Sequence, residues 1–258
     1  MPPTRFGLWL SNRLRLGRGT AQLRPVSELT GLGSTQLARI AALGKSYGVG
    51  FERRMSRADA IECYVYLDFL DRWRACLGGE WPLGRRVLDV GSKNFYYAAA
   101  LHAALRPSKL TGLELEGYRL FPNLHSRHDY ALAHIRGLAN TEYQVGDIRS
   151  WDQAADVITC FYPFVSLKAH KAWGLPAAVF EPQAQFQGMA RLLPEDGWLL
   201  MVNQGAEEAS RAADFARAVG LKRFTCLELG DPLAPRPLPP VLSAWQPAAA
   251  FASVRVTA

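Results

Sequence analysis

Acidic side chains and a loop glycine follow successive apolar segments of this chain. The first segment, "RVLDV" (86–90), contains Asp89 and is followed by Gly91. Glu114 lies near the end of the second segment, and Asp147 comes just after the third. If these segments are parallel strands, their carboxyl ends share one edge of a sheet, where open α/β sheets bind ligands. Carboxylates accept hydrogen bonds from hydroxyl and amino groups, so the pattern predicts a nucleoside site.

The loop after the first segment narrows the choice of nucleoside. Dinucleotides are bound by G-x-G-x-x-G and nucleoside triphosphates by a P-loop, because backbone must approach the phosphates closely. This loop has Gly91 but then Lys93, Asn94 and Ala98, so side chains stand where those motifs need none. S-adenosyl-L-methionine joins an adenosine to a short zwitterion without phosphates and tolerates such side chains better. The sequence therefore favours this cofactor over NAD or FAD.

Each part of that cofactor has a candidate partner. Glu114 would accept the two ribose hydroxyls, unless the strand end slips by two residues and Glu116 takes the role. Asp147 would accept the adenine amino group, and the amides of residues 92–95 would face the carboxylate. Lys93 would add a direct charge at that carboxylate. Plainer alternatives remain open: Asp89 could only orient the loop, Lys93 could be solvated and Asp147 could be a turn residue. The expected cofactor-binding residues are Asp89, Gly91, Ser92, Lys93, Asn94, Glu114 and Asp147.

The elements that must position these residues alternate along the chain. Apolar runs predict strands at 86–90, 110–115, 142–145, 156–161 and 197–203, and helical patterns fill 95–105, 118–136, 183–193 and 206–219. This alternation predicts a parallel sheet with helices on both faces. Two last strands, 224–229 and 241–245, are separated by a proline-rich segment and most simply pair antiparallel. Before the sheet, capped helices are expected at 34–44 and 56–79, and little fixed structure in 1–34.

These motifs resemble those of the class I S-adenosylmethionine-dependent methyltransferases over residues 85–245. "VLDVGSKNF" is similar to the family's D-x-G-x-G-x-G, with Lys93 and Phe95 in place of later glycines. "LTGLEL", "YQVGDIRSW", "ADVITCFYPF" and "LLPEDGWLLMVNQG" are similar to its second to fifth strand motifs. "VGSKNFYY" together with "VNQGAEE" resembles a bacterial subset of the family.

The resemblance implies both architecture and activity. The expected fold is α/β, with a seven-stranded Rossmann-like sheet, mostly parallel, ending in an antiparallel hairpin and preceded by helices. The expected parts are a basic arm (1–34), a helical extension (35–80) and the cofactor-binding domain (81–258). The expected activity is in-line methyl transfer, which needs placement of the acceptor and exclusion of water.

Substrate-facing residues are expected after the fourth and fifth strands. "FYPF" is similar to the N-P-P-Y motif of amino-group methyltransferases only at Pro163–Phe164, so that chemistry is not assigned. Tyr162 and His170 are the candidates for a proton-handling group. The long connection 163–183 and the 56–79 helix are expected to cover the acceptor. The other substrate-facing candidates are Phe161, Trp173, Asn203, Gln204 and Glu207.

Charge distinguishes the possible partners. Residues 1–57 contain ten basic and two acidic groups, whereas the whole chain has a net charge of +7. Only an anionic partner that meets this segment would exploit it. A small-molecule acceptor is favoured; RNA bound through residues 1–57 is the first alternative, and an inactive cofactor-binding partner subunit is the second.

Other residue classes predict little further chemistry. His125, His128, Asp129 and His134 are expected on a solvated helix face rather than at a metal. Cys160 and Cys226 are expected as buried thiols in a reduced, cytoplasmic protein. No apolar run reaches the length of a membrane span. The methyl acceptor and the oligomeric state are not indicated.

Overall fold

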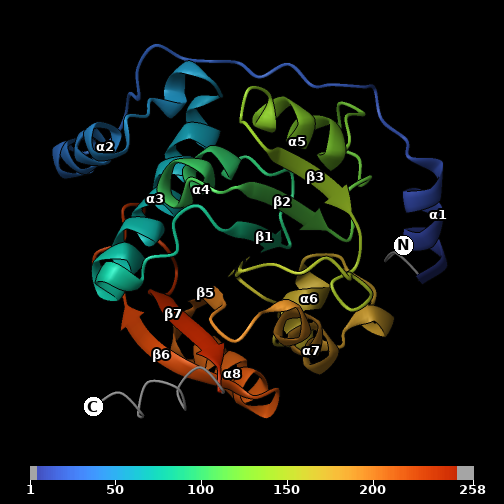
Figure 1. Ribbon diagram of the computed structural model, residues 1–258. Helices are drawn as coiled ribbons and strands as arrows, with labels where there is room; N and C mark the ends of the chain where they lie inside the picture. The colour runs from blue at the N-terminus through green and yellow to red at the C-terminus, as the bar shows by residue number, and fades with distance from the viewer. Residues whose placement is uncertain (1–4, 249–258) are drawn as a thin grey trace, which may run out of the picture.

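A seven-stranded sheet organises the computed structural model, which describes residues 5–248 (Figure 1). Its spatial order is β3-β2-β1-β4-β5-β7-β6, and β7 runs antiparallel to both of its neighbours. The other pairs are parallel, as the α/β pattern predicts. The strands are β1 (Arg86–Val90), β2 (Lys109–Glu114), β3 (Thr141–Val145), β4 (Val157–Phe161), β5 (Trp198–Gln204), β6 (Leu221–Glu228) and β7 (Pro240–Pro247).

The strand register brings the sequence motifs to one edge. Val90 at the end of β1 is level with Leu113 of β2 and Cys160 of β4. Glu114 at the end of β2 is level with Val145, two residues before Asp147. The loop after β1 therefore lies between the ends of its two neighbours.

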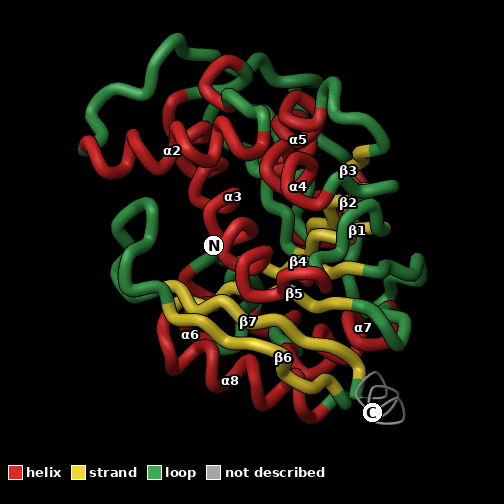
Figure 2. The backbone as a smooth tube through the Cα atoms, turned by 60° about the vertical axis from the view of Figure 1, so that its left-hand side comes forward, coloured by secondary structure: helices red, strands yellow, loops and turns green. Residues whose placement is uncertain are grey.

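Helices cover both faces of the sheet (Figures 1 and 2). One face carries α3 (Arg57–Leu77), α4 (Ala98–Leu105) and α5 (Arg127–Ile135), with α2 (Ser34–Tyr47) packed outside α3. The other face carries α7 (Pro182–Leu192) and α8 (Gly205–Ala218). Shorter elements are α1 (Arg5–Leu14), α6 (Leu167–Ala172) and the 3-10 turns Phe51–Arg53, Gly78–Glu80 and Ala177–Val179.

Helix α3 joins the N-terminal extension to the sheet. Ser56 caps it by accepting a hydrogen bond from the amide of Asp59. Its buried Tyr66 stacks on Tyr97 with ring centroids 4.0 Å apart. A single buried apolar cluster runs from Phe51 through α3 to Val87 of β1. The extension therefore shares the core of the sheet domain.

Several elements differ from the sequence expectation. The helix expected over 118–136 begins only at Arg127, because Pro122 interrupts the pattern and Ser126 with Asp129 forms a capping box. Residues 5–14, where little fixed structure is expected, form α1. The buried-thiol prediction holds for Cys160 but is wrong for Cys226, which is exposed because β6 is an edge strand.

The contact of the Phe95 ring with Gly112 of β2 leads to a stability prediction. A Cβ atom at Gly112 would lie 2.6 Å from the Phe95 ring, so Gly112→Ala overpacks this contact. We expect a loss of about 1–3 kcal/mol in the free energy of unfolding, measured by urea denaturation. Gly230→Ala is the control, since its added Cβ meets nothing within 4 Å, and it should change stability by less than about 0.5 kcal/mol. Equal stability of the two variants would contradict the packing argument.

Candidate functional site

The loop after β1 has the backbone of a glycine-rich loop although two of its residues are not glycine. Gly91, Lys93 and Phe95 have φ angles of +79°, +54° and +53°. In this left-handed region an L-residue other than glycine is strained by roughly 1–2 kcal/mol. The positions where the family motif has glycine thus keep its conformation with larger side chains.

Contacts from neighbouring strands hold this strained loop. The Lys93 amide donates to a carboxylate oxygen of Glu114 at 2.8 Å, and the Tyr143 hydroxyl donates to the Lys93 carbonyl. The Gly91 amide donates to the Leu113 carbonyl at 2.9 Å. Both sides of Lys93 are therefore fixed by side chains of β2 and β3.

Phe95 and Lys93 point to different places. Phe95 is fully buried and packs over Gly112 and against Tyr97, at a ring distance of 5.8 Å. It does not obstruct the edge of the sheet. Lys93 lines the cavity there, so only this substitution changes what a ligand would meet.

Asp89 has an internal role in the loop. Its two carboxylate oxygens accept hydrogen bonds from the Tyr97 hydroxyl at 2.7 Å and the Thr159 hydroxyl at 2.6 Å. It is fully buried, and burial raises its pKa to about 6. The buried Ser92 hydroxyl donates to the Asp89 carbonyl. This geometry favours the interpretation in which Asp89 orients the loop rather than contacts a ligand.

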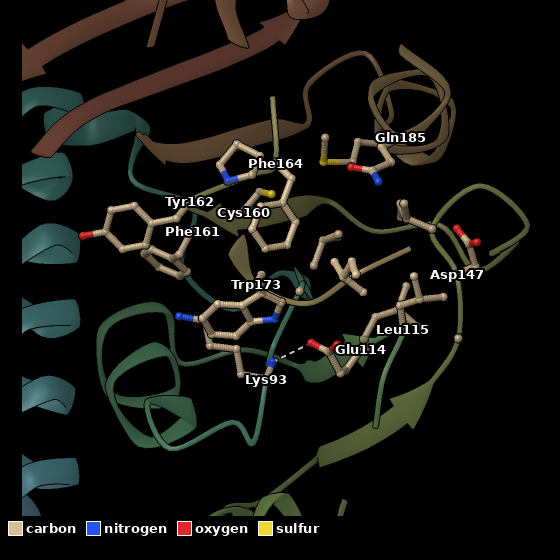
Figure 3. Close-up of a pocket in the computed structure, with 18 residues that line it drawn as sticks. Lys93, Glu114, Leu115, Asp147, Cys160, Phe161, Tyr162, Phe164, Trp173 and Gln185 are labelled. Atoms are coloured by element: carbon tan, nitrogen blue, oxygen red, sulfur yellow. Dashed lines mark hydrogen bonds between the residues drawn. The ribbon is translucent and has the colours of Figure 1, made fainter. Parts of the chain in front are cut away.

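A cavity of about 110 Å³ opens beyond the ends of β1 to β4 (Figure 3). Gly91, Lys93, Glu114 and Asp147 line it. Asp89, Ser92, Asn94 and Glu116 are not among its lining residues. Its apolar walls include Val90, Leu113, Leu115, Ile148, Phe164 and Met189.

Glu114 is held in the cavity by groups of three other residues. One carboxylate oxygen accepts from the Lys93 amide, and the other from the Glu116 amide at 2.9 Å and from Arg127 at 3.1 Å. Arg127 is buried and also pairs with Glu116 at 3.3 Å. No motif in the sequence singles out Arg127, because only the tertiary fold brings α5 against the end of β2.

Asp147 lies at the opposite end of the cavity from Tyr162 (Figure 3). Its carboxylate accepts several hydrogen bonds from Arg149, which also pairs with Glu181 at 2.7 Å. The amide of Arg149 closes the turn onto Asp147 at 3.0 Å. The carboxylate thus has both the turn role and a position on the cavity wall.

Trp173 covers the middle of the cavity. Its ring lies 5.1 Å from the Lys93 ammonium and 5.4 Å from the Arg127 guanidinium carbon, and its carbonyl accepts from Arg119 at 2.9 Å. Cations over an indole face are attracted by its π-electrons. Burial lowers the pKa of Lys93. The segment after β4 is therefore held over the cavity by charged side chains from the loop after β1, the loop after β2 and α5.

A second cavity of about 460 Å³ adjoins the first. Both are lined by Lys93, Tyr162, Phe164 and Trp173, which form the wall between them. Tyr162 has a φ of +60°, and its hydroxyl is buried with no hydrogen-bond partner among residues 5–248. Backbone strain and unsatisfied buried polar atoms are both more common at functional sites than elsewhere. Both features therefore single out Tyr162.

The remaining expected residues are distributed unevenly. Phe161 lines the first cavity and Gln204 the second. Asn203 is buried and lines neither cavity, and His170 is buried with one ring nitrogen 2.9 Å from the Pro176 carbonyl. Glu207 is exposed and pairs with Arg211, whereas its neighbour Glu208 lines the second cavity. Burial raises the pKa of Glu208.

The histidine-rich segment also differs from expectation. The prediction of a solvated face is wrong for Asp129 and His134, which are buried. Asp129 accepts from the Ser126 amide in the capping box, and His128 stacks on Tyr118 at 5.1 Å. These residues therefore serve the packing and start of α5.

Solved structures with the same arrangement decide the fold. An S-adenosylmethionine-dependent methyltransferase from Aquifex aeolicus has a TM-score of 0.51 at 14% identity, covering 69% of this chain and 89% of its own. One from Clostridium acetobutylicum has a TM-score of 0.51 at 9% identity, covering 83% and 98%. A candidate RNA methyltransferase from Pyrococcus horikoshii has a TM-score of 0.51 at 12% identity, covering 84% and 98%.

The chain has the fold of S-adenosylmethionine-dependent methyltransferases. The seven-stranded sheet with its antiparallel C-terminal pair confirms the predicted fold class. No protein-family model and no curated protein matches the sequence. Identities this low establish the fold alone. Among the described residues, no helix combines the length and the apolar character that crossing a bilayer requires.

The side chains of this methyltransferase fold suit the cofactor that the sequence predicts. Glu114 presents a carboxylate beside apolar walls, and Asp147 and Ile148 follow β3. A Cβ atom at Gly91 would meet nothing within 4 Å, and its φ of +79° favours glycine there. The donor set therefore fits a nucleoside with ribose at Glu114 and a base between apolar side chains.

Burial of Asp89 leads to a pH prediction. The pKa of Asp89 lies near 6 in the folded protein against 3.8 ordinarily, so the folded state binds this proton more tightly. Stability must then fall as pH rises from about 4 to 6. Compared with Asp89→Asn, the wild type should lose about 1–3 kcal/mol in free energy of unfolding between pH 4 and pH 7. Urea denaturation at each pH measures the difference, and a constant difference would contradict the raised pKa.

Proposed function

We propose that the protein is an S-adenosylmethionine-dependent methyltransferase that acts on a small-molecule acceptor. The observation that supports it most is the position of Glu114. Its carboxylate is held by hydrogen bonds at the end of β2, and it lines a cavity at the carboxyl ends of the parallel strands. The strained loop at Gly91 and Lys93 lies directly beside it. The loop keeps its shape at an energetic cost, which is typical of a functional site.

In this proposal each residue of the first cavity has a defined task. Glu114 accepts the ribose hydroxyls, and Asp147 together with Ile148 contacts the base. The Lys93 ammonium faces the carboxylate of the amino-acid tail. The loop amides do not take this role as the sequence suggested, because those of Ser92, Lys93 and Phe95 already donate within the protein. Asp89 and Ser92 keep the loop in place from within. The bound cofactor supplies an activated methyl group that needs little further chemistry from the protein.

The second cavity supports a small acceptor. It is bounded by the wall of Lys93, Tyr162, Phe164 and Trp173, so an acceptor there adjoins the first cavity. Trp173 and the segment around α6 exclude water from the junction, which favours methyl transfer. The first cavity at about 110 Å³ is smaller than the roughly 300 Å³ or more of ordinary ligand sites. We therefore propose that the Trp173 segment moves outward to admit the cofactor.

Proton handling falls to a different residue from those the sequence suggested. Burial raises the pKa of Tyr162 to about 12, so its hydroxyl stays protonated at neutral pH and does not serve as a base. His170 lies behind Phe164, at a ring distance of 5.5 Å, and lines neither cavity. Glu208 lines the second cavity, and its raised pKa suits a proton acceptor.

Isothermal titration calorimetry with S-adenosylmethionine, S-adenosylhomocysteine and NAD tests the cofactor assignment. We expect both sulfur nucleosides to bind and NAD to fail. Glu114→Gln keeps the shape of the side chain but removes its charge, and should weaken S-adenosylhomocysteine about tenfold or more. Glu195→Gln, on an exposed turn, should bind as the wild type does.

Two outcomes of the calorimetry, and one of a separate assay for transfer of labelled methyl groups from S-adenosylmethionine, would be decisive. Equal binding of all three ligands, or none, would refute the cofactor proposal. Unchanged binding by Glu114→Gln would refute only the ribose assignment. Binding without transfer of labelled methyl groups to any small molecule of a cell extract would support the inactive partner subunit instead.

RNA is the second candidate acceptor, favoured by the position of α1. This helix lies beside the sheet edge near β3 (Figure 1), and its Asn12 side chain donates to the carbonyl of Leu115, a cavity residue, at 2.8 Å. The exposed Arg13, Arg15 and Arg18 follow within and after it. An RNA held by this segment would therefore lie close to the site.

Neutralising these arginines separates the two candidates. The triple variant Arg13→Gln, Arg15→Gln, Arg18→Gln keeps α2 in place. Deletion of residues 1–57 would remove this helix and expose the core beneath it. If RNA is the acceptor, the variant should bind a structured RNA more weakly and lower the slope of log K against log salt by about 2–3. A gel-shift titration measures both. Identical slopes would leave only the small-molecule proposal.

A further inference from the structure

Two residues that line the second cavity carry buried hydrogen-bond donors without a partner in the described part of the chain. The Tyr162 hydroxyl and the Nε atom of Arg236 both lack a hydrogen-bond partner among residues 5–248. Both residues line this cavity, and the positive charge of Arg236 partly offsets the rise that burial causes in the pKa of Tyr162. Buried donors without partners are uncommon in folded proteins, and a bound ligand is one explanation of such a group.

Arg236 is held in position by its other end. Its Nη2 atom donates to Glu62 of α3 at 2.6 Å, and this ion pair is only partly exposed. The guanidinium therefore cannot turn away to solvent without breaking that pair. Its remaining N–H groups stay directed by the same planar frame, as bidentate recognition requires.

The charges of the cavity favour an anion. Lys93 and Arg236 are its cationic lining residues, and Glu208 is its acidic one. Glu62 pairs with Arg236 but does not line the cavity. The other lining side chains include Phe164, Trp173 and Leu238, which give it apolar walls.

We propose that the second cavity binds the carboxylate of a small acceptor molecule, one oxygen receiving the Arg236 Nε–H and the other the Tyr162 hydroxyl. An apolar or planar body then lies against Phe164, Trp173 and Leu238. The proposal rests on the proposed function in treating this cavity as the acceptor site. It adds the chemical class of the acceptor, and it names Arg236 and Tyr162 as its binding residues.

Benzoate and its neutral match benzamide are the probes. Binding to the whole protein is followed by calorimetry with and without saturating S-adenosylhomocysteine. We expect benzoate to bind about tenfold more tightly than benzamide, because charge-assisted hydrogen bonds are the stronger ones. Benzoate should also bind in the presence of S-adenosylhomocysteine, since the two cavities are distinct.

Two variants test the binding residues separately. Tyr162→Phe removes only an unpartnered hydroxyl, so its melting temperature should be unchanged or higher, while its benzoate affinity falls about fivefold or more. Arg236→Gln should weaken benzoate about tenfold or more, and Arg217→Gln, an exposed arginine of α8 paired with Asp214, should have no effect. A merely structural role for Tyr162 would lower stability and leave benzoate affinity unchanged.

The outcomes distinguish this proposal from the proposed function. Any of three results would overturn the carboxylate site. Benzoate and benzamide could bind equally well, S-adenosylhomocysteine could displace benzoate, or Tyr162→Phe and Arg236→Gln could both bind benzoate as tightly as the wild type does. Absence of benzoate binding at high concentration would overturn it too. A different result would refute the methyltransferase proposal but retain the anion site. In that case S-adenosylhomocysteine fails to bind, while benzoate binds the wild type and binds both variants more weakly.

Discussion

The hydrogen bond from the Lys93 amide to the Glu114 carboxylate is the contact on which the site depends. It joins the strained loop after β1 to the end of β2, and the same carboxylate is fixed by Arg127 and by the Glu116 amide. Because Glu114 is buried, each of these bonds forms in a medium of low dielectric constant and strengthens the others. Without them, Lys93 and Phe95 would lose the support that keeps them in the left-handed region.

A second set of contacts explains how the N-terminal helices take part in the same site. Tyr66 of α3 stacks on Tyr97, whose hydroxyl donates to Asp89. Glu62, one turn before Tyr66, holds Arg236 at the second cavity. The extension thus contacts the loop after β1 through the core and the second cavity through Glu62. The N-terminal helices therefore help to position the residues of both cavities.

The wall between the two cavities consists of residues with unusual surroundings. Lys93 is a cation beneath an indole ring, and Tyr162 combines a positive φ with an unpartnered hydroxyl. The positive φ angles of Lys93 and Tyr162 and the unpartnered hydroxyl cost free energy, although the Tyr162 ring also packs against the apolar core. Such a concentration of costs at the junction of two cavities is typical of selection for binding rather than for stability.

The sequence by itself determined the order of strands and helices, the antiparallel end and the carboxylates at the strand ends, because apolar periodicity and chain order encode them locally. It could not place Arg127, Arg236 or Glu208, since their positions at the two cavities depend on how helices and loops pack around the strand ends. It also left open whether Lys93 and Phe95 obstruct the loop. Only the tertiary structure decided that Phe95 packs over Gly112 while Lys93 enters the cavity, because that choice depends on the space beneath a neighbouring strand.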